Sequence, residues 1–232
     1  MITPKSSYIN IHGHRGASNI HEWVLKNMFA QDYPPEDVAY GNYSVGFHPY
    51  HIGKVDEEDT LNKVRIATEN LKVYAIGEIG LDKSIAIPLD KQMQIFRTQV
   101  EIAEYAELPV ILHVVKAYNE IIEFMKSNQP VVPMIVHGYN GGPQMAEELI
   151  KAGFLISFGE AIAGGSEKIL EALRIVPMEN LFLETDEGEL DIRELYKITS
   201  EIKKISNDLL RFQIFENTRT SFSRFADYYE IK

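Results

Sequence analysis

Cysteine is absent from this chain of 232 residues. Disulfide bonds and thiolate metal ligands are therefore excluded, and a site for a transition metal must be built from imidazole nitrogens and carboxylate oxygens. Imidazoles are scarce as well, because the chain has seven histidines against 34 aspartates and glutamates. A search for a metal site thus reduces to a few histidines and the acids that accompany them.

Long hydrophobic runs and targeting segments are missing too. No run reaches the 18 apolar residues of a transmembrane helix. Residues 1–16 read directly into a strand and lack the basic, apolar and small-residue regions of a signal peptide. We therefore expect a cytoplasmic protein without membrane association and without an obligate protein partner. Internal repeats, low-complexity tracts and long linkers do not occur, so we expect one domain over residues 1–232.

Positive charge is in short supply. The chain carries 23 lysines and arginines, and its formal net charge is −11. A surface of this sign repels the phosphates of nucleic acids unless a local basic patch or bound cations reverse it. The composition therefore argues against non-specific binding to duplex DNA or RNA.

Short apolar runs alternate with segments of helical periodicity along most of the chain. An apolar stripe begins at Leu89, Pro143 suits the first turn of a helix, Asp191 opens another helix and Ser206 can cap the last one. This alternation predicts an α/β fold with a parallel sheet. The apolar runs that we interpret as strands span residues 8–12, 42–48, 73–76, 109–114, 132–136, 154–158 and 181–185.

The predicted sheet is one strand short of a complete barrel. A TIM barrel has eight strands, and the apolar runs supply seven. The stretch from Glu22 to Ala30 has a helix-like pattern, and a break at Pro34-Pro35 follows it. We therefore predict a TIM-like (β/α) barrel that is distorted or lacks one strand–helix unit near the N-terminus.

Histidines and acids follow the predicted strands. His12 and His14 stand two residues apart at the end of the first strand, where strand geometry sends both side chains to one face. Four further residues each lie at the carboxyl end of another predicted strand. In a barrel these ends meet at one rim, where catalytic groups collect. The four residues are Glu78, His113, His137 and Asp186.

A metal centre explains this pattern better than a structural role. A single histidine on a strand is most often a core residue that hydrogen-bonds to the backbone. Six residues in equivalent positions do not fit that explanation, because uncompensated buried charges cost several kcal/mol each and a divalent ion removes this cost. The sequence therefore predicts a site for one or two divalent ions, with zinc, manganese, magnesium and iron all compatible with the donors.

Other polar residues near the predicted rim are candidates for binding substrate. His48 closes the second predicted strand and could contact a substrate phosphate or the ligand shell of a metal. Lys116 follows His113, and Glu160 follows the strand at 154–158. A phosphate-cleaving site usually includes a cation, and Arg15 and Lys83 are also near the rim. Cations of this kind are most often solvated surface residues. His51 fits a solvated loop residue as well as it fits a functional one.

Seven segments of the sequence resemble the TatD-related hydrolases of the amidohydrolase superfamily. The order and spacing of the segments cover nearly the whole chain, and Asn217 and Phe222 resemble the closing helix of the family. The segment GEIGLD, followed by a helix and LPVILH, is a specific match. The seven segments are HGH (12–14), VGFHP (45–49), AIGEIGLD (75–82), LPVILH (108–113), IVHG (135–138), ISFG (156–159) and LFLETD (181–186).

The resemblance implies roles for the candidate ligands. It implies a TIM-like barrel in which His12 and His14 bind one ion and Glu78 bridges to a second ion. His113 and His137 would complete the shell of that second ion. Asp186 would ligate metal and act as the base for the attacking water, which makes Asp186 and Glu78 the catalytic residues.

This chain departs from the family pattern on the substrate side. The spacing between HGH and FHP is shorter than in typical members, which agrees with the loss of one strand–helix unit. Val114-Val115-Lys116 replaces the usual arginine after His113, and Glu187 replaces the common proline after the ETD motif. These differences spare the six predicted ligands but bear on the substrate.

The leading functional prediction is hydrolysis of a phosphodiester or related ester by metal-activated water. The resemblance implies a deoxyribonuclease, with the ends of single-stranded DNA or RNA or a nucleotide-like small molecule as substrate. A metal-dependent hydrolase of a small lactone, ester or amide is the alternative, because the same centre can attack carbon. A third alternative is a catalytically silent member that binds metal, and the complete set of six ligands argues against it.

Overall fold

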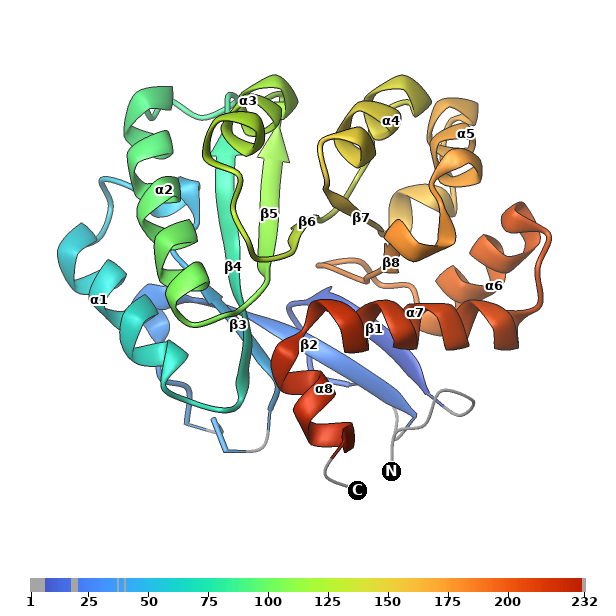
Figure 1. Cartoon of the computed structure of the whole chain (residues 1–232), viewed down its shortest axis with the longest axis horizontal. Coiled ribbons are helices and arrows are strands. Elements are labelled where there is room, and N and C mark those ends of the chain that lie inside the picture. The colour runs from blue at the N-terminus through green and yellow to red at the C-terminus, as the bar shows by residue number, and fades with distance from the viewer. Residues whose placement is uncertain (1–6, 18–20, 37, 40, 231–232) are drawn as a thin grey trace. The chain divides into compact units, whose positions relative to one another are not determined.

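The computed structural model describes residues 7–17, 21–36, 38–39 and 41–230, with side chains up to residue 226 (Figure 1). Part of the segment without signal-peptide features, residues 1–6, lies outside this range. Within the described residues, every helix is too short or too polar to cross a membrane.

The protein has an α/β fold of the TIM-like barrel class, as predicted. Eight strands follow one another in the sheet in chain order, from β1 to β8. The pairs β1–β2, β3–β4, β4–β5 and β7–β8 are parallel, and a parallel bridge between Gly13 and Asp186 also joins the last strand to the first. The strands are β1 (Tyr8–Gly13), β2 (Glu22–Phe29), β3 (Tyr43–Gly46), β4 (Val73–Asp82), β5 (Val110–Val115), β6 (Met134–Val136), β7 (Leu155–Phe158) and β8 (Leu181–Leu183).

Helices alternate with the strands from β3 onward. Short 3-10 helices η1 to η4 occur in the connecting loops, at Ala30–Asp32, Pro49–His51, Glu160–Ile162 and Met178–Asn180. The α-helices are α1 (Glu57–Thr68), α2 (Leu89–Tyr105), α3 (Tyr118–Asn128), α4 (Pro143–Lys151), α5 (Glu167–Ile175), α6 (Ile192–Lys203), α7 (Asn207–Ser221) and α8 (Ser223–Glu230).

Contacts within the chain define two compact units. Unit 1 comprises Met1–Lys26 and Val136–Ser221. Its strands β1, β7 and β8 pack against α4, α6 and α7, and the phenol of Tyr196 on α6 donates a hydrogen bond of 3.0 Å to the Ile9 carbonyl oxygen of β1. Tyr196 is fully buried, and burial raises the pKa of its phenol well above the ordinary value, so it stays protonated. The C-terminal helices thereby hold the strand that carries His12.

Unit 2 comprises Asn27–Ile135 and Phe222–Lys232. Strand β4 lies between β3 and β5 in the sheet, and helix α2 packs along β4 (Figure 1). The side chain of Gln99 on α2 accepts a hydrogen bond from the Phe47 backbone N–H at 2.7 Å and donates one to its carbonyl oxygen at 3.1 Å. A buried amide that pairs both backbone groups of one residue fixes the end of β3, and His48 follows directly.

The segment from Glu22 to Ala30 is strand β2, not the predicted helix. Its residues pair with β1, with Ile9 opposite Trp23 and Asn10 opposite Val24. A short apolar run has no periodicity that separates a strand from a helix, and pairing with β1 decides the outcome. The barrel therefore has all eight strands. The N-terminal part of the barrel has a reduced helix content and not a missing strand. Within the described residues, the short 3-10 helix η1 is the only helix between β1 and β3.

Helix α1 is absent from the predicted elements. It has a clear start signal, because Asp56 accepts a hydrogen bond from the Asp59 N–H and three acids occupy the first turn. Other predicted helix ends are confirmed. Pro143 is in the first turn of α4, Asp191 caps α6 by accepting from the Arg193 N–H, and Ser206 accepts from the Leu209 N–H at the start of α7.

Candidate functional site

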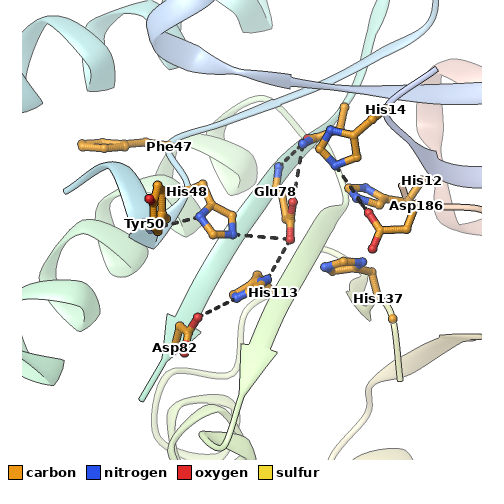
Figure 2. Close-up of polar contacts among 12 residues, drawn as sticks. His12, His14, Phe47, His48, Tyr50, Glu78, Asp82, His113, His137 and Asp186 are labelled. Carbon is orange, nitrogen blue, oxygen red and sulfur yellow. Dashed lines mark hydrogen bonds and ion pairs between the residues drawn. The ribbon is translucent and has the colours of Figure 1, made fainter. Parts of the chain in front are cut away.

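Unit 1 brings two imidazoles and one carboxylate together. His12 lies at the end of β1 and is fully buried, and His14 follows the strand with a side chain that is 24% exposed. The Asp186 Oδ1 atom lies 3.4 Å from the Nε2 atoms of both histidines (Figure 2). Backbone bonds from the Asp186 N–H to the His12 carbonyl and from the His14 N–H to the Asp186 carbonyl hold the segments in register. These three predicted ligands therefore converge.

Asp186 is the accessible member of this group. Its side chain is 41% exposed, and its backbone lies in the left-handed region with φ 51°, which a short polar side chain tolerates better than most. Burial alone would raise the pKa of Asp186, but hydrogen bonds from His12 and His14 and the charges of nearby histidines hold it well below its usual value. Asp186 is therefore a carboxylate at neutral pH.

His137 is the fourth predicted metal ligand in unit 1. It follows β6, and its ring centroid lies 4.3 Å from that of His12. Its Nδ1 atom lies 3.1 Å from Oε1 of Glu184, a fully buried carboxylate directly after β8. Sequence analysis did not select Glu184, although it stands two residues before Asp186 in the same ETD motif.

Unit 2 holds a second group of imidazoles around a carboxylate. The Glu78 Oε1 atom lies 2.8 Å from Nδ1 of His113 and 3.5 Å from Nε2 of His48 (Figure 2). The other ring nitrogen of His48 accepts a hydrogen bond from the Tyr50 N–H, which fixes the orientation of the ring. His48, for which the sequence left open a contact with substrate or with a ligand shell, lies beside the predicted ligands Glu78 and His113.

Glu78 lies inside its strand and not at the carboxyl end, where the sequence analysis put it. Strand β4 continues to Asp82, and its register against β5 shifts between Ile76 and Ile79. The Asn27 side chain accepts from the Glu78 N–H at 3.0 Å and donates to Glu78 Oε2 at 3.5 Å. The run of buried glycines and aliphatics in GEIGLD lets the strand continue, so the motif encodes a strand longer than its apolar core VYAI. His113 likewise lies inside β5, two residues before its end.

Asp82 is a functional candidate that sequence analysis missed. Its Oδ2 atom lies 3.2 Å from Nε2 of His113, and Oδ1 accepts from the N–H and hydroxyl of Ser84. Burial alone would raise the pKa of Asp82, but the hydrogen bonds from Ser84 and His113 lower it below its ordinary value. The available signal was spacing, because residues 78 and 82 share one face of an extended strand.

Removing Asp82 should weaken metal binding without unfolding the protein. A carboxylate on the far nitrogen of a ligating histidine orients the ring and raises its basicity, and its loss typically costs about 10–100-fold in metal affinity. We expect a loss in this range for Asp82→Ala by isothermal titration with Mn²⁺ or Zn²⁺. Asp90→Asn, at an exposed acid on α2, is the control. Equal affinities for the two variants would contradict a role of Asp82 in the site.

The other predicted substrate residues lie on the surface. Lys116 is exposed just after β5, and Glu160 is exposed at the start of η3. Lys83 forms an ion pair with Glu120. Burial, His48 and Lys54 lower the pKa of His51, so its ring is neutral at pH 7, and it packs against Phe29.

Unit 1 also has a small cavity next to its cluster. Its volume is about 170 Å³, and its lining includes Arg15, Glu22, Thr185 and Gly188. Arg15 follows His14 in the chain, and Thr185 precedes Asp186. The cavity therefore adjoins the candidate ligands and presents an arginine, two backbone segments and several acids to a small polar group.

The residues present fit divalent metal ions. Each unit contains at least one group of three side chains whose ligand atoms all lie within 4.8 Å of one another. His12, His14 and Asp186 form one in unit 1, and His48, Glu78 and His113 form one in unit 2. His137, Glu184 and Asp186 form another in unit 1. The donors are nitrogen and oxygen only, which suits zinc, manganese and iron and, through the oxygens, magnesium. The buried Glu184 Oε2 atom, which has no hydrogen-bond partner, also indicates that a cation is needed nearby.

Comparison with known proteins gives relatives of one kind. The uncharacterized metal-dependent hydrolase YabD of Bacillus subtilis is 33% identical over 149 residues, which are 62% of this chain and 57% of the relative. The 3'-5' ssDNA/RNA exonuclease TatD of Erwinia billingiae is 28% identical over 177 residues, 74% of this chain and 67% of the relative. The matched stretch thus spans little more than half of the YabD protein.

A solved structure and a family sequence model agree with the resemblance noted in the sequence. The crystal structure of YJJV, the TatD homologue of Escherichia coli, has a TM-score of 0.82 at 22% identity and covers 95% of this chain and 99% of its own. This likeness establishes the fold. The sequence model of the family described as TatD related DNase matches residues 36–223, well over half of the sequence. The chain therefore belongs to the TatD-related DNase family.

Proposed function

We propose that this protein is a metal-dependent hydrolase that cleaves phosphodiester bonds with an activated water. The observation that carries the proposal is the group in unit 1, where the Asp186 carboxylate lies 3.4 Å from two imidazole nitrogens and remains 41% exposed. A structural ion pair has no need of that exposure, but a base that acts on a bound water does. Family membership supports the same class of chemistry.

We assign one divalent ion to each group of ligands. His12, His14 and Asp186 would hold the first ion, and Glu78 and His113, joined by His48, would hold the second. His137 belongs with the first group in the structure, so its assignment to the second ion, and the bridging role of Glu78, stay predictions from the resemblance. We also propose that residues 1–232 act as one hydrolase domain.

The residues of this chain have distinct tasks in the reaction. A bound divalent ion lowers the pKa of its water and polarises a phosphoryl oxygen. Asp186 accepts the proton of that water at a carboxylate oxygen, since its low pKa keeps it ionised at neutral pH. His12 and His14 hold the carboxylate in place from β1. Arg15, at the neighbouring cavity, is available to bind a non-bridging phosphate oxygen.

We propose the end of a single-stranded nucleic acid as substrate. The relative from Erwinia billingiae is named as a 3'-5' exonuclease on single-stranded DNA and RNA. The net charge of −11 argues against a long electrostatic footprint on a duplex, and a cavity of about 170 Å³ accepts one terminal group and not a helix. The same charge predicts weak affinity and strong dependence on the metal. Lys116 and Glu160 stay candidates for contacts farther along the strand.

The test is a substrate panel with the metal-loaded protein. End-labelled single-stranded DNA, single-stranded RNA, blunt duplex DNA and a set of lactones are incubated with Mn²⁺, Mg²⁺ or Zn²⁺. We expect stepwise shortening of the single strands and little cleavage of the duplex. Turnover of lactones alone would replace this function by the small-carbonyl alternative. No cleavage and no metal uptake with any cation would favour a silent family member.

We propose the cytoplasm as the site of action. The complete absence of cysteine agrees with a chain that does not depend on disulfides. Fractionation of cells that express the tagged protein, followed by immunoblotting, checks the location. Recovery in the periplasmic or membrane fraction would contradict it.

A further inference from the structure

Glu184 has an unusual position for a carboxylate. It is completely buried at the end of β8, and its backbone N–H donates to the Phe158 carbonyl of β7 at 3.1 Å. Its Oε1 atom accepts from the Gly138 N–H at 2.7 Å and lies 3.1 Å from Nδ1 of His137. Its Oε2 atom is buried and has no hydrogen-bond partner. One oxygen of this side chain therefore has two close nitrogen partners, while the other has none among the described residues.

This geometry determines which nitrogen of His137 carries a proton. The Oε1 atom already accepts from the Gly138 N–H and therefore acts as an acceptor, so the short contact requires an N–H on Nδ1 of His137. In a neutral ring the proton on Nδ1 leaves the lone pair on Nε2. The Gly138 N–H and the Nδ1–H reach the same oxygen from adjacent residues, so the carboxylate also fixes the orientation of the ring.

A cation on Nε2 accounts for the buried charge. Burying a carboxylate is costly unless a positive charge or several donors compensate it. Among the described residues, the side chain of Glu184 contacts His137 and Gly138 and forms no ion pair with arginine or lysine. A divalent ion bound to Nε2 makes the Nδ1–H more acidic and places positive charge on the ring, as in the carboxylate–histidine–metal arrangements of many metalloproteins.

We propose that Glu184 is a positioning residue for the metal site of unit 1, which holds His137 as the Nδ1–H tautomer with Nε2 directed to the ion. This inference rests on the proposed metal-dependent function and adds a residue to it. Glu184 also forms, with His137 and Asp186, a group whose ligand atoms lie within 4.8 Å of one another, so direct ligation through Oε2 is the alternative that the experiment must separate from positioning. The contribution of Glu184 as a positioning residue is to select one of two tautomers and one ring orientation before the metal arrives.

The experiment compares Glu184→Gln and Glu184→Ala with the wild-type protein. Histidine ring nitrogens are assigned by long-range ¹H–¹⁵N NMR on the metal-free protein, and Mn²⁺ or Zn²⁺ affinity is measured by isothermal titration. Glu184→Gln retains an acceptor oxygen for His137 and Gly138, whereas Glu184→Ala removes it. Glu171→Gln is the control, since Glu171 is an exposed acid of unit 1 that pairs with Arg174 outside the candidate ligands. Circular dichroism confirms that each variant is folded.

We expect the Nδ1–H tautomer of His137 in the wild type, in Glu184→Gln and in the control. Glu184→Ala should show the Nε2–H tautomer or a mixture, with metal affinity reduced about 10–100-fold. Glu184→Gln should fall between, because it loses the charge and retains the hydrogen bond. If Glu184→Ala fails to fold, Glu184→Gln alone decides, through a loss of affinity with an unchanged tautomer.

The outcomes separate this inference from the function it rests on. A wild type that binds metal, beside an Ala variant with equal affinity and an unchanged tautomer, overturns the role of Glu184 and leaves the hydrolase proposal standing. A wild type that binds no metal overturns the hydrolase proposal, and the tautomer of His137 still reports on the contact. A Glu184→Gln variant that loses one ion per chain overturns positioning, because Glu184 is then a ligand.

Discussion

Replacing Asp186 by asparagine is expected to lower kcat by about 10²–10⁴-fold, the range typical for the loss of a general base. Asparagine retains one side-chain oxygen near His12 and His14 and tolerates the left-handed backbone at φ 51°. The variant should therefore fold and retain part of its metal. Steady-state kinetics on a labelled single strand, with metal content measured on the same sample, checks this expectation.

The control for this variant is Asp208→Asn, at an exposed acid on α7 that pairs with Arg211. It removes the same charge far from the ligands in the sequence and should retain the wild-type rate. A near-normal rate for Asp186→Asn would mean that another group accepts the proton. An Asp186→Asn protein that has lost all metal would instead assign the defect to binding.

Removal of metal by a chelator is expected to abolish activity completely and to destabilise the fold. Within each unit the ligands come together only in the folded state, and an ion that binds only this state stabilises it by about 2.7 kcal/mol at 100 times its Kd. For a chain of this size each kcal/mol shifts Tm by about 2–4 °C, so we expect a decrease of about 5–11 °C. Activity and Tm should recover when Mn²⁺, Mg²⁺, Zn²⁺ or Fe²⁺ is restored.

Matched histidine variants show whether the effect comes from the proposed site. His14→Ala should weaken metal binding, because His14 is one of three ligands in unit 1. His21→Ala, at an exposed histidine outside both groups, should leave it unchanged. Full activity in a chelated sample without detectable metal would remove the basis of the mechanism.

Most of the fold was predictable from local patterns. Seven of the eight strands were visible as apolar runs because buried parallel strands are continuous in hydrophobicity, and α4, α6 and α7 were marked by residues that suit helix starts. Strand β2 was not, because Glu22–Phe29 has a mixed pattern that only its pairing with β1 resolves. Helix α1 was missed although Asp56 and the acids after it signalled its start.

The candidate site divides in the same manner. His12, His14, His113, His137, Glu78 and Asp186 could be selected because strand ends and the family motifs mark them. Asp82 and Glu184 were not selected, since acids are abundant in this chain and the spacing of Asp82 from Glu78 becomes a signal only once the strand is known to extend to Asp82. Their importance appears in contacts with His113 and His137.

The sequence by itself determined the chemistry that this protein has at its disposal. Without cysteine, and with few histidines, its metal ligands had to be imidazoles and carboxylates, and the family motifs showed where they stand. Only the tertiary structure decided which of them meet. It placed Asp186 between two imidazoles, and it set a buried carboxylate behind His113 and another behind His137. The reason is physical, because a strand pattern gives the face to which a side chain points, whereas distances between ring nitrogens and oxygens depend on the register of paired strands.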